Sequence, residues 1–172
     1  MLITEGCKAL LQLCYVCPVP KKTLPEIYVD EHIKPPVIEA FEECGFKCIQ
    51  ISKTKKYAGR NEDDYIEEIY SEGRLFATSD VQFRKRVLAK KNKVKRAGIV
   101  EIPPDVDYED IGPVIGLLAG CVEGYIEAFG KNSLRNHVLY VAHDGFHLVD
   151  EKGKDLLRYS FEALDIDLKR WT

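Results

Sequence analysis

IYVDEHIKPPVIEAFEECGFKCIQIS, from Ile27 to Ser52, is the stretch that decides the fold. The short apolar run Ile27–Val29 predicts a buried strand, which ends at the acidic pair that follows it. Pro35 suits the first turn of a helix, and Gly45 suits the position just after that helix ends at Cys44. The residues after Gly45 alternate weakly and predict a second strand. Together these elements predict a strand–helix–strand unit with parallel strands.

The same alternation of short apolar strands and helices continues along the chain. Further strands are predicted at Leu75–Ala77 and Ala97–Ile102, and helices at Asn61–Ser71, Val81–Lys91 and Pro113–Phe129. The segment His137–Asp150 contains two strand-like runs around a His-Asp-Gly turn, which predicts a hairpin. Strands that alternate with helices favour a parallel sheet with helices on both faces. The predicted fold class is therefore α/β, with a C-terminal β-hairpin.

The length of 172 residues fits one domain with short additions at its ends. Residues 1–25 are expected to form an N-terminal helix and linker, residues 26–150 the domain, and residues 151–172 a helical tail. With 45% apolar and 31% charged residues, the composition is that of an ordinary globular protein. It excludes collagen-like, disordered and small disulfide-scaffold classes.

Six cysteines, at positions 7, 14, 17, 44, 48 and 121, accompany no recognisable signal peptide. No apolar run approaches the ~20 residues that a membrane span needs. These features indicate reduced, buried thiols and a cytoplasmic location. The four thiols of Cys14, Cys17, Cys44 and Cys48 leave two alternatives open, a zinc site and a disulfide.

Basic residues are concentrated in two segments of a chain whose net charge is −3. Arg84–Arg96 holds eight of the 25 Lys and Arg residues, and Lys53–Arg60 is a basic loop. A basic segment on an acidic body attracts polyanions such as nucleic acids. A solvated helix face with a lysine-rich connection explains the same pattern, so both interpretations stay open.

Acidic residues follow two of the predicted strands and open a predicted helix. Asp30 comes directly after the first strand, Asp80 follows the third, and Asp63 lies in the first turn of a helix. In open α/β sheets such positions converge at the carboxyl edge of the strands, where ligands bind. Converging carboxylates repel one another, and a hard cation such as Mg²⁺ or Mn²⁺ relieves the repulsion. Helix capping is the alternative explanation for each acid.

The order of these motifs resembles that of PIN-domain-like nucleases, in particular the small prokaryotic branch linked to toxin–antitoxin systems. This chain has VDEHI at 29–33, ECGFKCIQI at 43–51, NEDDYIEEI at 61–69 and LFATSDVQF at 75–83. The resemblance covers about Ile27–Ile102 and implies a three-layer PIN-like fold. It also implies a metal-dependent ribonuclease that hydrolyses RNA phosphodiester bonds.

The resemblance assigns roles to individual residues. Asp30, Asp63 and Asp80 would hold Mg²⁺ or Mn²⁺. Thr78 would orient Asp80 or the attacking water. Basic side chains would guide RNA by its phosphates without reading its bases, and these are Lys53, Lys55, Lys56, Arg60, Arg84, Lys85, Lys90 and Lys91. The branch implies an antitoxin protein as a partner, and small residues in Pro113–Phe129 favour close helix packing, within the chain or in a homodimer.

One position departs from the family pattern. The family has a last acid in its Thr-x-Asp-x-Asp-Phe run, and this chain has Gln82 there, which carries no charge. Glu31, Asp64 and Glu101 are the acids that could take its place. The departure leaves an alternative open, a catalytically degenerate PIN-like module that binds RNA or a protein.

Other chemistries match the sequence less well. Carboxylates at strand ends also suit a phosphoacceptor receiver domain, but no aspartate closes the third strand with a strand-end lysine downstream. His137, His143 and His147 lie in the predicted hairpin and are candidates for a metal site or a general base. Alternating strand positions and a turn explain the same three histidines.

Overall fold

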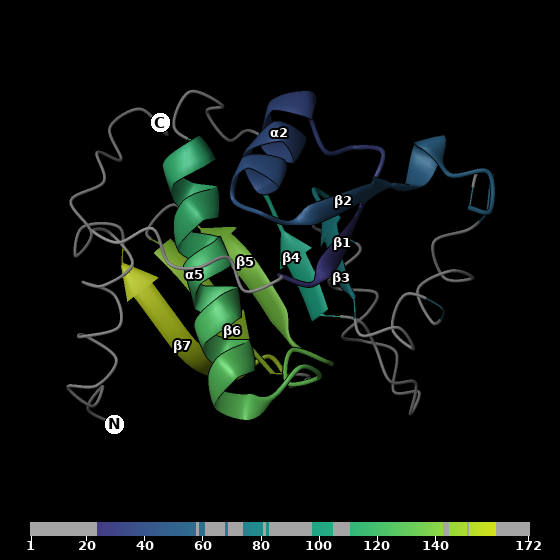
Figure 1. Ribbon diagram of the computed structural model, residues 1–172. Coiled ribbons are helices and arrows are strands. Elements are labelled where there is room, and N and C mark those ends of the chain that lie inside the picture. The colour runs from purple at the N-terminus through teal and green to yellow at the C-terminus, as the bar shows by residue number, and fades with distance from the viewer. Residues whose placement is uncertain are drawn as a thin grey trace.

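The computed structural model describes residues 24–57, 59–60, 68, 74–80, 82, 98–104, 111–142, 145–150 and 152–160. In this part of the chain the protein is an α/β molecule built on one seven-stranded sheet (Figure 1). The strands are β1 (Glu26–Val29), β2 (Lys47–Gln50), β3 (Leu75–Thr78), β4 (Gly98–Glu101), β5 (Val138–Ala142), β6 (Gly145–Val149) and β7 (Asp155–Ser160). The helices are α2 (Pro35–Glu43) and α5 (Ile111–Phe129), with a 3-10 turn, η1 (Ile51–Lys53), after β2.

The strand order in the sheet is β2-β1-β3-β4-β5-β6-β7. Strands β2, β1, β3, β4 and β5 pair in parallel, whereas β5, β6 and β7 pair antiparallel. The chain adds β2 on one side of β1 and β3 on the other, so the sheet reverses its direction of growth between β1 and β3. Such a reversal is the switch point at which open α/β sheets bind ligands. The predicted α/β class, with its hairpin β5–β6, is confirmed.

The β1-α2-β2 unit forms as the sequence predicts. Helix α2 begins at Pro35, whose missing N–H is one that the first helical turn leaves unused. Gly45 follows the helix end and takes a φ of +97°, in the left-handed region that residues with a Cβ rarely adopt. Phe46 then donates its backbone N–H to the Phe41 carbonyl, and the two rings pack edge to face. This tight turn returns the chain to the sheet as β2.

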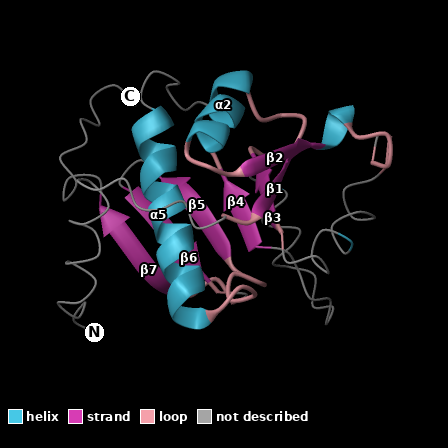
Figure 2. Ribbon diagram, viewed as in Figure 1, coloured by secondary structure: helices cyan, strands magenta, loops and turns pink. Residues whose placement is uncertain are grey.

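Helices α2 and α5 lie side by side over one face of the sheet (Figure 2). Phe41 of α2 and Val114, Ile115 and Leu118 of α5 are fully buried in the core between helices and strands. Within the residues that the structure describes, α5 alone is long and apolar enough to cross a membrane, a test that the core helix of a soluble protein also passes. It begins before the predicted start, and Pro113 still lies in its first turn, where backbone N–H groups have no helical partner.

The opposite face of the sheet, called here the second face, carries an apolar cluster and a line of polar side chains. The cluster contains Tyr28, Phe76, Ile99, Val138 and Val149. Side chains two positions apart in a strand share a face. The second face therefore also carries Asp30, Thr78, Glu101, Tyr140 and His147, which we call the polar row. Apart from Glu68 and Gln82, the helices predicted at 61–71 and 81–91 lie outside the described residues.

The C-terminal segment differs from the prediction. Residues Asp155–Ser160 form β7, so the expected helix is wrong there, and the sheet continues past the predicted domain end at Asp150. A tight turn precedes this strand, in which Asp150 Oδ1 accepts the backbone N–H groups of Lys152 and Lys154 at 2.8 and 2.9 Å. Pairing with β6 outweighs the helical tendency that the charged sequence suggested. The predicted helix near the N-terminus and residues 161–172 lie outside the described part.

Candidate functional site

Two strand-end residues meet at the switch point between β1 and β3. Asp30 follows β1 directly, and its backbone N–H bonds to the Ala77 carbonyl of β3 at 3.0 Å. Thr78, the last residue of β3, donates its hydroxyl to Asp30 Oδ2 at 2.8 Å. The two residues are 4% and 0% exposed, respectively. These bonds hold the Asp30 carboxylate at the carboxyl edge of the sheet, where the sequence predicts it.

The Thr78 hydroxyl also joins the segment that follows β3 to the one that follows β1. Thr78 Oγ1 accepts the backbone N–H of Asp80 at 3.0 Å. In the same segment, Ser79 Oγ donates to the His32 carbonyl at 3.3 Å. Thr78 thus contacts both of the predicted metal ligands that the structure describes, Asp30 through its carboxylate and Asp80 through its backbone.

Asp80 is half-buried, and its carboxylate makes a local bond of its own. Asp80 Oδ1 accepts the backbone N–H of Gln82 at 2.8 Å. Aspartates that cap helices or form Asx turns make this kind of bond. One carboxylate oxygen of Asp80 therefore makes the kind of bond that the capping alternative predicts. A carboxylate has two oxygens and about four acceptor sites, so this bond does not exhaust it.

The predicted metal site is incomplete within the described residues, because Asp63 lies outside them. In that part of the chain no three His, Cys, Asp or Glu side chains are arranged to hold a metal ion. Asp30 nevertheless fits a hard cation, since its Oδ1 accepts no hydrogen bond from the described residues while Oδ2 is held by Thr78. Carboxylate oxygens are the ligands that Mg²⁺ and Mn²⁺ prefer.

Glu101 lies next to Thr78 in the polar row. The two residues are paired in register between β3 and β4, and Glu101 is 5% exposed. Asp30, Thr78 and Glu101 thus follow or end three neighbouring strands, β1, β3 and β4. Of the acids named as substitutes for the one missing at Gln82, Glu101 is buried at this edge and Glu31 is exposed, whereas Asp64 lies outside the described residues.

The polar row continues from Glu101 to Tyr140 and His147 through the registers of β4, β5 and β6. The Tyr140 and His147 rings stack with centroids 4.8 Å apart and an interplanar angle of 14°. A register shift between β6 and β7 pairs Asp155 with Val149, and Asp155 Oδ1 lies 3.8 Å from His147 Nδ1. His147 is a buried strand residue, as the alternation predicted, and sequence reasoning missed its neighbours because they depend on register.

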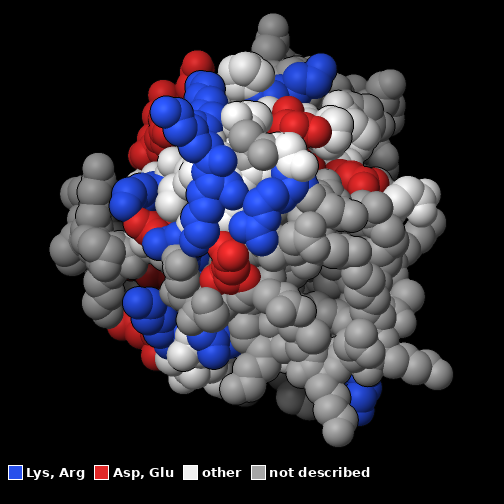
Figure 3. Space-filling model, turned by 90° about the vertical axis from the view of Figure 1, so that its right-hand side faces the viewer, with Lys and Arg blue, Asp and Glu red and all other residues white. Residues whose placement is uncertain are grey.

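The loop after β2 carries Lys53, Lys55, Lys56 and Arg60, all predicted to bind RNA and all exposed. Figure 3 shows Lys and Arg side chains gathered on this side of the molecule, with acidic side chains beside them. Lys56 Nζ lies 2.9 Å from Glu68 Oε2, and Arg60 Nη1 lies 3.3 Å from Glu68 Oε1. The bond to Glu68 raises the pKa of Lys56, and the bond from Lys56 lowers the pKa of Glu68. The other predicted RNA contacts, Arg84, Lys85, Lys90 and Lys91, lie outside the described residues.

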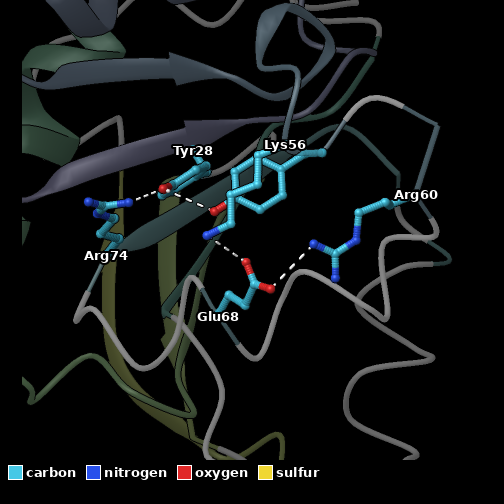
Figure 4. A network of polar contacts seen from close by, with 6 residues as sticks. Tyr28, Lys56, Arg60, Glu68 and Arg74 are labelled. Atoms are coloured by element: carbon cyan, nitrogen blue, oxygen red, sulfur yellow. Dashed lines mark hydrogen bonds and ion pairs between the residues drawn. The ribbon is translucent and has the colours of Figure 1, made fainter.

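Aromatic residues anchor this loop to the second face (Figure 4). Tyr57 is 3% exposed and packs edge to face on Tyr28 of β1, with ring centroids 5.6 Å apart and hydroxyl oxygens 3.5 Å apart. Arg74 donates to the Tyr28 hydroxyl, and its guanidinium carbon lies 5.0 Å from the centre of that ring. Arg74 and Lys47 both pair with Glu26, and the hydrogen bond from Lys47 lowers the pKa of Glu26. Sequence reasoning missed this network entirely.

Cys44, Cys48 and Cys121 are half-buried thiols that take part in no disulfide. Burial raises the pKa of Cys44, and it raises the pKa of Cys48 to about 12. The zinc site left open as an alternative also needs Cys14 and Cys17, so it stays a prediction. The interpretation as reduced, packed thiols fits these three residues, and Cys14 and Cys17 lie outside the described part.

The carboxyl edge of the sheet combines oxygen donors at a switch point with a basic loop beside it. Oxygen donors suit hard divalent cations, and basic side chains suit phosphates. The described residues of this edge can therefore bind a divalent cation and an anion such as a phosphate. Comparisons of the chain with protein-family models, with curated proteins and with solved structures found no match.

Proposed function

We propose that the protein is a metal-dependent ribonuclease with a three-layer PIN-like fold. The observation that carries the proposal is the Thr78 hydroxyl, which bonds the buried Asp30 carboxylate at 2.8 Å and the Asp80 backbone at 3.0 Å. This hydroxyl joins, at the switch point of the sheet, two of the three acids that the chain shares with the family pattern. The complete burial of Phe76 and Val138 on the second face supports a third layer.

In this proposal Asp30, Asp63 and Asp80 hold Mg²⁺ or Mn²⁺. The bound ion would activate water for attack on a phosphodiester and stabilise charge on the leaving oxygen. Thr78 keeps the Asp30 carboxylate in one orientation, so that this ligand is in place before the ion binds. Glu101, buried beside Thr78, adds a further negative group to the edge that attracts the cation.

The basic loop supports RNA as the substrate. Lys53 and Lys55 are exposed just after the end of β2, the strand that pairs with β1. They would bind RNA phosphates, together with Arg84, Lys85, Lys90 and Lys91. Such contacts orient a strand without reading its sequence. The resemblance to the toxin branch adds an antitoxin protein that binds this enzyme, and the reduced cysteines support a cytoplasmic setting.

One observation favours a second candidate, a catalytically degenerate PIN-like module that binds RNA or a protein. The Asp80 carboxylate accepts the Gln82 backbone N–H at 2.8 Å, and the Gln82 side chain replaces an acid of the family pattern. Both features reduce the negative charge available to a second metal ion. A module of this kind would bind RNA with the same salt dependence and hydrolyse none.

A nuclease assay with Mn²⁺ separates the two candidates. We expect wild type to cleave single-stranded RNA, and Asp30→Asn and Asp80→Asn to lose at least about 100-fold in rate, since even outer-shell partners of a metal cost 10–100-fold. Glu39→Gln, on the exposed surface of α2, is the matched control for lost charge and should cleave like wild type. Thermal melting of each variant shows that it is folded.

Two outcomes of this assay would contradict parts of the proposal. Wild type that cleaves nothing with Mn²⁺ or Mg²⁺ contradicts the nuclease proposal and supports the binding module. Asp80→Asn that retains full activity while Asp30→Asn loses it would assign Asp80 to capping alone.

A further inference from the structure

Glu68 is held between two cations of the basic loop. Its two carboxylate oxygens lie 2.9 Å from Lys56 Nζ and 3.3 Å from Arg60 Nη1 (Figure 4). The side chains remain open to solvent, with 56% of Lys56, 35% of Arg60 and 37% of Glu68 exposed. A competing anion can therefore reach both cations without any rearrangement of the core.

The backbone of the loop that carries the two cations is held by contacts that do not involve Glu68. Tyr57, between them in sequence, is buried against Tyr28, and Lys56 Nζ lies 5.3 Å from the centre of the Tyr57 ring. The backbone N–H of Arg60 bonds to the Tyr57 carbonyl at 3.0 Å, and that of Tyr57 to the Thr54 carbonyl at 2.9 Å. Removal of the Glu68 charge should therefore leave Lys56 and Arg60 near one another.

The chemistry of this arrangement is that of a phosphate site. A carboxylate and a phosphodiester each present two oxygens that share one negative charge, and Arg and Lys bind both groups by charge-assisted hydrogen bonds. Exposed ion pairs contribute little to stability, so a phosphate can replace Glu68 at small cost to the fold. The loop begins beside Asp30, because Gln50, just before η1, is paired with Val29, just before Asp30.

We propose that Lys56 and Arg60 form a binding site for one backbone phosphate of single-stranded RNA, and that Glu68 occupies this site in the free protein. Glu68 is then an internal competitor that lowers the affinity of the basic loop for RNA. The inference rests on the proposed function, because it names the part of the protein that holds the substrate strand.

The test measures RNA binding without metal, in EDTA, so that no cleavage takes place. Glu68→Gln should bind a short single-stranded RNA several-fold more tightly than wild type at low salt. Its plot of log affinity against log salt should be steeper by about 0.7, the value for one additional phosphate on a single strand. The control is Glu39→Gln, which removes the same charge from α2 and should change neither the affinity nor the slope by as much. Inorganic phosphate, added alone as a competitor, should compete more strongly for Glu68→Gln than for wild type.

A triple variant tests whether the higher RNA affinity of Glu68→Gln depends on Lys56 and Arg60. Lys56→Gln and Arg60→Gln, added to Glu68→Gln, should abolish the gain. Equal gains in Glu68→Gln and Glu39→Gln, or a gain that survives in the triple variant, would overturn the proposal, because net charge alone would then explain it. Inorganic phosphate that binds while RNA shows no gain would overturn RNA as the ligand. The result is independent of catalysis, since a wild type inactive with Mn²⁺ contradicts the nuclease and leaves this measurement unaffected.

Discussion

The Thr78 side chain makes two bonds in a position without access to water. It donates to Asp30 Oδ2 and accepts from the Asp80 backbone N–H. Removing one partner from a buried hydrogen bond leaves the other polar group with its desolvation cost. A single hydroxyl therefore decides both the stability of the switch point and the placement of a candidate metal ligand.

Replacing Thr78 by Val keeps the shape of the side chain and removes the hydroxyl. We expect Thr78→Val to lower the free energy of unfolding by about 1–3 kcal/mol, because the buried Asp30 carboxylate loses its donor. Affinity for Mn²⁺ should fall as well, since Asp30 is no longer oriented. Urea denaturation and calorimetric titration measure the two effects. Thr78→Ser is the control that keeps the hydroxyl, and a Thr78→Val variant as stable as Thr78→Ser would contradict the role given to the hydroxyl.

Glu26 gives a pH dependence of stability. The hydrogen bond from Lys47 holds the folded-state pKa of Glu26 below 4.5, the ordinary value that we take for the unfolded chain. A carboxyl group with a lowered folded-state pKa stabilises the fold above its unfolded-state pKa, and this contribution disappears as the pH falls through the folded-state pKa. Below pH 4.5, wild type should therefore lose stability more steeply than Glu26→Gln. The difference should stay under about 1 kcal/mol, because the pair is near the surface. Urea midpoints between neutral pH and pH 3 test this, and parallel curves for both proteins would contradict it.

At the scale of elements, strand β7 adds an edge strand to the sheet after the predicted end of the domain at Asp150. It pairs with β6 along nearly its whole length, with one register shift near Val149. That pairing brings the Tyr159 backbone very close to Gly145, where an added Cβ would lie 1.5 Å from the Tyr159 carbonyl oxygen. The start of β6 therefore requires a residue without a side chain.

Gly145, at the start of β6, and Gly153, in the turn between β6 and β7, give a matched pair of variants. We expect Gly145→Ala to destabilise the protein by at least about 2 kcal/mol, because the new methyl group overlaps backbone that cannot move without breaking β6–β7 pairing. Gly153→Ala also places a residue at positive φ, +76°, but meets no atom within 4 Å. Its cost should be about 1 kcal/mol, from backbone conformation alone. Thermal and urea denaturation compare the two, and equal losses would remove the close approach as the cause.

At the scale of the whole molecule, charge is distributed unevenly over the surface. The net charge is −3, yet the basic loop after β2 is exposed on one side of the sheet, beside the switch point. Long-range attraction of RNA to an acidic protein requires that positive charge be concentrated in this way. Lys53 and Lys55 are the members of this loop that make no ion pair within the described residues.

The double variant Lys53→Ala/Lys55→Ala tests this charge distribution. If each lysine neutralises one phosphate, the slope of log affinity against log salt should become shallower by about 0.7 per lysine. Binding of Mn²⁺ should stay unchanged, because neither side chain belongs to the carboxylate group. Fluorescence anisotropy with single-stranded RNA at several salt concentrations measures the slope. Unchanged slopes would mean that this loop is a solvated surface and that RNA binds elsewhere.

Short sequence patterns were enough to predict most of the strands and helices that the structure describes. The β1-α2-β2 unit, β3, β4, α5 and the β5–β6 hairpin follow from apolar runs, prolines at helix starts and Gly45 at a helix end. Each of these signals acts over a few residues, so the sequence alone reveals it. The predicted helix was wrong at Asp155–Ser160, because these residues form a strand only by pairing with the edge that β6 offers.

The sequence by itself determined the α/β class and the positions of Asp30 and Asp80 at the ends of strands. Only the tertiary structure decided which side chains meet there. Thr78 and Asp30 are 48 residues apart, and Arg74 and Tyr28 are 46 apart, so their contacts depend on which strands become neighbours and in what register. The polar row has the same origin. Strand neighbours and register are set by burial over the whole sheet, and no local pattern in the chain specifies them.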